Sequence, residues 1–255
     1  MRLLHWFLKR AFRGSIRSRL TGRRRNPDRP EEGRFTRVDI DWIVKDAWRE
    51  LDSLLPAARL DRYPRQGTRL NAFLSVATLA VYRAVRRAGI DKGHAIGLVA
   101  DAGWPVYHAM IRIPRFPARL LRRTPQGRID FVIRAFLRFP FAPPADPRAA
   151  GYRVEAWKDE AGMHTHWTRC PPLEVFHELC EADEIDAFRG TWCAFDYPAA
   201  EAIAAGGRFI RPHVLSRGDP VCDMNWTTVD NEVVEEVSRG ARINGQRSER
   251  ASHLS

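Results

Sequence analysis

Side chains that could do chemistry gather between residues 164 and 226 of this 255-residue chain. The four cysteines all fall there, at Cys170, Cys180, Cys193 and Cys222. A Cys-x-x-Cys pair is the strongest sequence sign of a structural zinc site, and no two of these cysteines have that spacing. A dispersed site of three cysteines with His164 or His166 stays open, whereas Cys180 best fits the role of a buried apolar residue.

Cys170 has the setting of a reactive thiol. Pro171 follows it, and proline is favoured at the first position of a helix, which places Cys170 at a helix N-cap. Unpaired backbone N–H groups and the helix dipole lower the pKa of a cysteine there, and the thiolate is the nucleophilic form. Strand alternation before it puts His164, His166 and Thr168 on one face, so His166 is a candidate general acid or base. A plain surface role for each histidine is the alternative.

Aspartates and tryptophans complete the set of candidates. Asp219 lies in Gly218-Asp219-Pro220, which is strong turn chemistry, so it either serves that turn or acts on a substrate. Asp196, Asp223 and Trp226 are candidates for substrate binding, and a place in the core is the alternative for Trp226.

Three segments carry a resemblance to a known family. Cys170-Pro171, the stretch 192–197 and the stretch 217–226 together resemble the L-2-amino-thiazoline-4-carboxylic acid hydrolase family. The likeness extends over residues 36–228, since the helical first half is compatible with it. The positions that match the family pattern are Cys170, Cys193, Gly218, Asp219 and Cys222. The resemblance implies hydrolytic opening of a thiazoline ring to N-carbamoyl-L-cysteine, a step in bacterial cysteine formation.

The candidate residues suit that chemistry. The target carbon is bonded to a ring sulfur, a ring nitrogen and an exocyclic amine, and the thiolate of Cys170, Cys193 or Cys222 could add to it. Ring sulfur would leave, and water would release a urea. Asp219 or Asp223 would hydrogen-bond the amidinium, and His166 would handle protons. We expect a small-molecule substrate, no cofactor and no metal. The alternative is a non-catalytic cysteine module that binds a metal or a ligand at the membrane surface.

The spacing of apolar residues and the positions of turn residues predict the helices and strands that position these residues. Helices are expected over residues 36–55 and 68–88. Thr36 and Asp39, a weaker relative of the capping box, begin the first, and the second ends at Gly89. Residues 94–140 suggest broken helices, with prolines as punctuation at Pro105, Pro114, Pro117 and Pro125.

In the second half of the sequence, the spacing of apolar residues changes from that of helices to the alternation of strands. Residues 152–168 indicate a hairpin, residues 173–180 and 198–205 short helices, and residues 208–228 a second hairpin turning at 217–220. The expected fold is α+β, with a helical N-terminal half followed by a small antiparallel sheet with short helices. The expected divisions are a basic arm and linker at 1–33, a hydrolase-like α+β domain at 34–229 and a polar tail at 230–255.

Charge is concentrated at the start of the chain. The formal charge is +11, but residues 1–25 hold nine basic side chains and no acid, and the rest holds 33 basic against 31 acidic residues. With no nucleic-acid motif present, we expect no specific nucleic-acid partner. Apolar residues recur every fourth position in this arm, at Leu4, Leu8, Phe12, Ile16 and Leu20.

That apolar stripe is typical of a helix that lies on an anionic membrane or packs on the body of the protein. No apolar run is long enough to span a bilayer, and the cysteines follow no disulfide pattern. We therefore expect a cytoplasmic protein, with contact to the inner membrane face through residues 1–25 left open.

Overall fold

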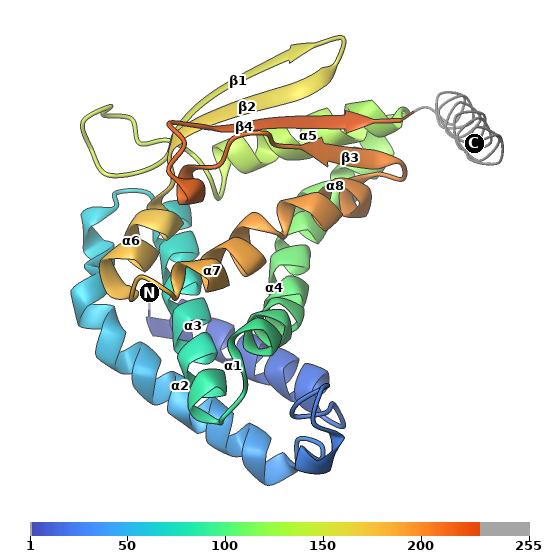
Figure 1. Cartoon of the computed structure of the whole chain (residues 1–255). Coiled ribbons are helices and arrows are strands. Elements are labelled where there is room, and N and C mark those ends of the chain that lie inside the picture. Colours follow the sequence, from blue (N-terminus) through green and yellow to red (C-terminus); the bar gives the residue numbers. More distant parts are fainter. Residues whose placement is uncertain (1, 230–255) are drawn as a thin grey trace, which may run out of the picture.

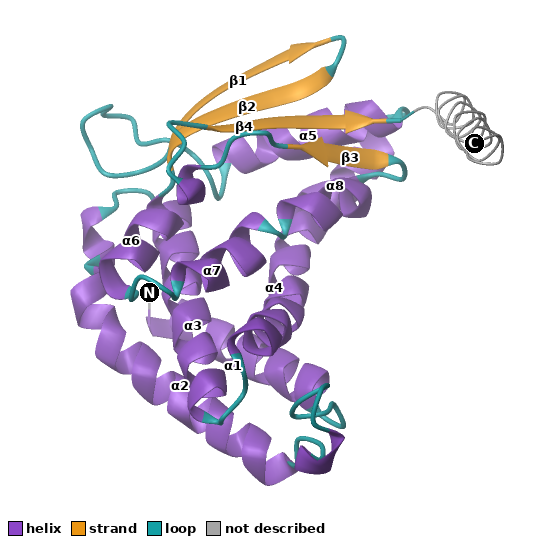
Figure 2. Ribbon diagram, viewed as in Figure 1, coloured by secondary structure: helices purple, strands orange, loops and turns teal. Residues whose placement is uncertain are grey.

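The computed structural model describes the backbone of residues 2–229 and the side chains of residues 9–229. Within them, helices fill the first half of the chain and an antiparallel sheet with shorter helices fills the second, as Figures 1 and 2 show. The α+β prediction is therefore confirmed. The long helices are α1 (Arg2–Leu20), α2 (Arg37–Ala58), α3 (Gln66–Arg87), α4 (Lys92–Leu121) and α5 (Pro125–Arg138).

The helix boundaries of the first half follow local sequence. α2 begins at the expected capping box, in which the Thr36 hydroxyl accepts from the Asp39 N–H at 3.2 Å and the Asp39 carboxylate accepts from the Thr36 N–H at 2.8 Å. α3 ends before Gly89, whose φ of 84° is a left-handed conformation that glycine adopts without strain. α3 is buried along most of its length because α2, α4 and α6 all pack against it.

Prolines do not break α4, contrary to the expectation of interrupted helices. The helix runs unbroken from Lys92 to Leu121 with Pro105, Pro114 and Pro117 inside it, and only Pro125 begins a new helix. An interior proline costs a helix about 3 kcal/mol. Packing of α4 against α1, α3, α5 and α8 offsets that cost, and local sequence could not reveal it.

The sheet joins the two predicted hairpins. Its strands lie in the order β1 (Arg153–Asp159), β2 (Gly162–Arg169), β4 (Cys222–Thr228) and β3 (Gly207–Ile210), each antiparallel to its neighbour. α5 packs on β2, β3 and β4, and α8 packs on β3, so these helices cover one face of the sheet (Figure 2).

Short helices connect the helical half to the sheet. They are α6 (Pro171–Leu179), α7 (Ile185–Phe188), a π-helical turn (Arg189–Cys193) and α8 (Asp196–Ile203). α6 and α8 match the two predicted short helices, whereas α7 and the π-helical turn were not expected. The π-helical turn matters because it carries Cys193.

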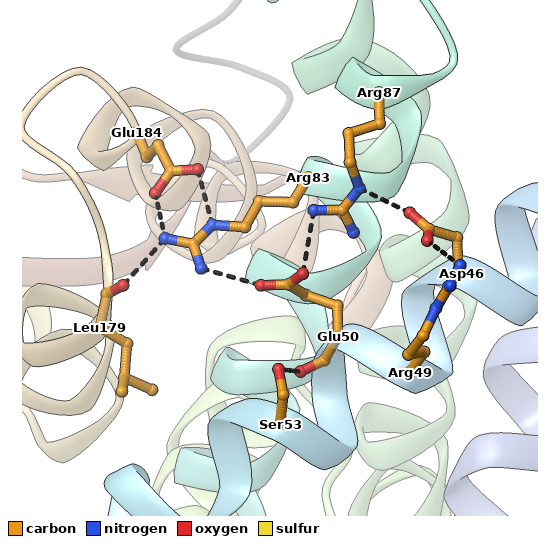
Figure 3. A network of polar contacts seen from close by, with 8 residues as sticks. All are labelled: Asp46, Arg49, Glu50, Ser53, Arg83, Arg87, Leu179 and Glu184. Atoms are coloured by element: carbon orange, nitrogen blue, oxygen red, sulfur yellow. Dashed lines mark hydrogen bonds and ion pairs between the residues drawn. The ribbon is translucent and has the colours of Figure 1, made fainter.

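A network of ion pairs holds this connecting segment against the long helices (Figure 3). Arg83 on α3 donates two hydrogen bonds to the Glu184 carboxylate, at 2.8 and 2.7 Å, and one each to Glu50 on α2 and to the Leu179 carbonyl. Arg87 extends the network to Glu50 and Asp46 on α2. The segment between α6 and α7 is thereby tied to α3.

The predicted arm packs into the body. Phe12, Ile16 and Leu20 are at most 4% exposed and lie in the same cores as α2, α3 and α4. Ser15 also donates to the Ala102 carbonyl of α4 at 2.6 Å. This part of the apolar stripe is used for packing, and the described part of the arm is not a separate unit.

No helix among the described residues has the length and apolar character needed to cross a membrane. The predicted tail at 230–255 lies outside the described residues.

Candidate functional site

A cavity of about 100 Å³ lies where α4, α5, the sheet and the connecting helices meet. Its wall is almost entirely apolar and aromatic. Its members come from segments far apart in the sequence, among them Tyr107, Phe141, Tyr152, Trp167, Trp192 and Trp226.

Three of the four cysteines line this cavity. Cys170 is the N-cap residue of α6, Cys193 closes the π-helical turn and Cys222 begins β4. Cys180 lies outside it, at the end of α6. All four thiols are free. The structure therefore brings together the three cysteines that the sequence singled out and leaves the fourth apart.

A buried ion pair supplies the charge in the cavity. Arg211 donates to the Asp196 carboxylate at 2.8 Å and to the Cys193 carbonyl, and its side chain is 4% exposed. Tyr107 donates its hydroxyl to the other oxygen of Asp196 at 2.9 Å. Burial raises the pKa of Asp196 above its usual value, and Arg211 and Tyr107 oppose that rise. The Arg211 Nε–H is buried without a hydrogen-bond partner among the described residues.

Hydrogen bonds fix the aromatic wall. Thr165 on β2 accepts from the indole N–H of Trp167 at 2.9 Å and of Trp226 at 3.4 Å. Tyr152 accepts from the Asn71 amide of α3 at 2.9 Å. The large rings therefore hold their orientations, and the cavity between them is preorganised.

Burial favours the neutral form of the three thiols that line the cavity. Burial raises the pKa of Cys170 and Cys193 above the usual value and that of Cys222 to about 11. At Cys170 the N–H of Leu173 opposes the rise, although Cys170 makes no capping hydrogen bond. The expected lowering of the Cys170 pKa by the helix N-terminus is therefore wrong, because desolvation outweighs the helix end.

Cys193 has the most polar surroundings of the three. Its Sγ lies 3.5 Å from the Ser216 hydroxyl, and Ser216, Arg211 and Arg189 all act against the rise of its pKa. Cys222 receives one N–H hydrogen bond, from Leu215 at 3.1 Å.

The histidines lie on the opposite face of the sheet from the cavity. Thr165 and Trp167 line the cavity, so strand alternation turns His164 and His166 away from it. His164 stacks on Trp157 and is 2.9 Å from Asp159, and His166 meets the edge of the same tryptophan. His166 is thus not placed to act as a base for these thiols, which corrects the expectation from sequence.

Two of the expected aspartates hold a loop. Asp219 accepts from the Val214 N–H at 2.6 Å, which is the turn role that the sequence left open. Asp223 accepts from both the N–H and the ring of His213, at 2.7 and 2.8 Å. Neither lines the cavity, so their expected contacts with a substrate are not supported. Asp196 and Trp226 do line it.

Sequence reasoning missed Tyr107 and Arg211. Tyr107 lies on α4 within a pattern typical of core residues, and Arg211 follows β3 among many exposed arginines. No local signal distinguishes Arg211 from those others. Only its pairing with Asp196, distant in the chain, shows its role.

The described residues contain no group of three His, Cys, Asp or Glu side chains arranged to hold a metal ion. Comparison with family models, with curated proteins and with solved structures gave no match for this chain.

Proposed function

We propose that this chain hydrolyses a small cyclic amidine of the 2-amino-thiazoline type, with a cysteine thiol as nucleophile. The observation that supports this is the meeting of Cys170, Cys193 and Cys222, from three separate segments, at one cavity that also holds the Asp196–Arg211 pair. Thiols are the nucleophiles suited to an electrophilic amidine carbon.

The charges of the cavity suit such a substrate, and its size limits the ligand. A volume of about 100 Å³ is smaller than the cavity of about 150 Å³ that accommodates benzene, so any ligand larger than a single small ring is excluded. The Asp196 carboxylate can pair with an amidinium. Arg211 keeps one N–H donor for a carboxylate on the ring, because its Nε has no partner among the described residues.

Cys193 is the best candidate for the nucleophile. It is the thiol on which Ser216, Arg211 and Arg189 all act to favour the thiolate. A cationic substrate would add to that effect, because positive charge beside a buried thiol favours its ionised form. Asp196, whose pKa burial raises, takes the role of proton acceptor that the sequence assigned to His166.

The reaction runs in two steps. The Cys193 proton passes to Asp196 as Sγ bonds to the amidine carbon, the carbon–sulfur bond of the ring breaks, and the ring sulfur takes that proton. Water then adds to the same carbon and gives a proton back to Asp196. The enzyme sulfur leaves and recovers this proton, a urea is released, and the extra proton of the amidinium passes to solvent.

Ring opening of 2-amino-thiazoline-4-carboxylate, followed as release of a free thiol product, tests the proposal. Cys193→Ser should abolish turnover, and Asp196→Asn should lower kcat by about a hundredfold. Cys180→Ser is the matched control, since Cys180 lies outside the cavity. Full activity in the Ser variants of Cys170, Cys193 and Cys222 would end the covalent mechanism.

Ligand binding without catalysis is the second candidate. The raised pKa of the three cavity thiols favours it, because a neutral thiol is a poor nucleophile. Saturable binding of the thiazoline with no ring opening by the wild-type chain would support this reading. A cytoplasmic location belongs to either proposal, since reducing conditions keep such thiols free.

A further inference from the structure

The second half of α4 presents large apolar side chains to solvent. Ile113, Phe116, Leu120 and Leu121 are 77%, 70%, 73% and 64% exposed. Single exposed apolar residues are ordinary on protein surfaces, but several on consecutive turns of one helix mark a surface that binds something.

Arginines flank this apolar surface. Arg112, Arg115 and Arg119 repeat the spacing of Ile113, Phe116 and Leu120 one position earlier, so the helix carries an apolar stripe and a basic stripe side by side. Arg122 and Arg123 follow at its end.

Among the described residues, the basic stripe has no acidic partners. The sequence holds no acid between Asp101 and Asp130, and in the described part of the chain Arg112, Arg115 and Arg119 form no ion pair. Burial, Arg119 and Arg112 lower the pKa of Arg115, which indicates mutual repulsion of the guanidinium groups.

The remaining face of the helix packs into the protein. Ile111 and Ala118 are fully buried beside α5 and the sheet. The helix therefore has three distinct faces at this point, one in the core, one apolar and exposed, and one basic and exposed. Such a helix suits the boundary between headgroups and acyl chains of a membrane, where apolar side chains insert and arginines meet phosphates.

We propose that the exposed face of α4 from Arg112 to Leu121, together with Arg122 and Arg123 after it, docks on an anionic lipid bilayer. A second copy of the chain fits less well, because a symmetric contact would bring two unpaired basic stripes together. The phosphates of a nucleic acid would pair with the arginines, but Phe116 and Leu120 would have no apolar partner. The site differs from the N-terminal arm that the sequence suggested, part of whose apolar stripe is buried in the core.

Cosedimentation of the full chain with vesicles tests this docking surface. One set contains phosphatidylcholine alone, and the other contains equal parts of phosphatidylcholine and phosphatidylglycerol. We expect binding to the anionic set, with little to the neutral set and release at high salt. Phe116→Ser and Leu120→Ser should each weaken binding roughly tenfold. Arg119→Glu should weaken it about 25-fold, because it changes the charge by two units.

Controls distinguish this surface from others. Val38→Ser removes an apolar side chain that is 78% exposed on α2, and Arg208→Glu reverses an exposed charge on β3; both should bind like the wild type. Circular dichroism of each variant checks that the fold is kept. We expect it to be kept, because the substituted positions are exposed.

Several results would overturn the proposal. One is equal binding to both vesicle sets, and another is no binding to the anionic set. A third is that the control variants lose as much binding as the variants of α4. Loss of binding in Arg13→Glu with Phe116→Ser unaffected would move the contact to the N-terminal arm. A dimer in analytical ultracentrifugation that Phe116→Ser dissolves would make a second copy the occupant.

Discussion

Replacing Arg211 with methionine should be among the most damaging single changes in the described structure. The Arg211 side chain is 4% exposed, and its guanidinium lies 2.8 Å from the Asp196 carboxylate and also donates to the Cys193 carbonyl. Methionine has similar length and keeps contact with the rings of Tyr197 and Phe209, over which Arg211 lies. The change therefore tests charge more than volume. Removing one partner of a buried pair costs about 3–5 kcal/mol.

The loss should depend on pH in a defined direction. Burial already raises the pKa of Asp196 in the wild type, and loss of Arg211 should raise it further. A carboxyl whose folded pKa is raised destabilises the fold as it ionises, so the cost is present above that pKa and absent below the unfolded pKa. The deficit of Arg211→Met should thus be largest at neutral pH and shrink towards about pH 4.

Urea unfolding of the wild type, Arg211→Met and the double variant Asp196→Asn/Arg211→Met measures this. The double variant contains no unpaired charge, so it should lose only about 1–2 kcal/mol for the missing hydrogen bonds. A loss below 1 kcal/mol in the single variant, a double variant as unstable as the single one, or a deficit that grows in acid would refute the reasoning.

Four further experiments probe other parts of the structure. Gly207→Ala should destabilise by at least about 2 kcal/mol in urea unfolding, because its Cβ would lie 2.1 Å from the Ala200 carbonyl oxygen. Gly97→Ala, with open space around it in α4, should be neutral or stabilising. Cys222, with a pKa of about 11, should react with iodoacetamide slowly at pH 8, at a rate that rises with pH towards that value. Arg83→Met should cost about 3 kcal/mol at neutral pH, measured by urea unfolding.

The stability lost in Arg83→Met should also depend on pH, in a defined direction. Burial alone would raise the pKa of Glu184, but Arg83 and the Glu181 N–H outweigh it, and the pKa lies below its usual value. A lowered carboxyl pKa stabilises the fold above the unfolded pKa and loses that effect as pH falls through the folded pKa. The difference between wild type and Arg83→Met should accordingly disappear in acid. A constant difference across pH would contradict the pairing.

Local patterns predicted most elements but failed where packing decided. The capping box of Thr36 and Asp39 and the two hairpins are short-range features, and they formed as expected. The continuity of α4 through Pro114 and Pro117 was missed, since the neighbours that stabilise it are distant in sequence. The helix end at Cys170 was identified correctly, but its effect on the thiol was misjudged because burial is invisible in a local pattern.

The candidate site shows the same division. Strand alternation correctly grouped His164 with His166, but it could not tell which face of the sheet meets the cavity. Asp219 kept the turn role that its neighbours Gly218 and Pro220 suggested.

The sequence by itself determined the residue types near the cavity, the helix and strand order, and the positions of caps and turns, because these depend on interactions among near neighbours. Only the tertiary structure decided that Cys170, Cys193 and Cys222 share one cavity and that Asp196 pairs with Arg211. It also decided that burial raises the pKa of these three thiols. These properties depend on which distant segments exclude water from each other, and desolvation and pairing between such segments leave no mark on the local order of residues.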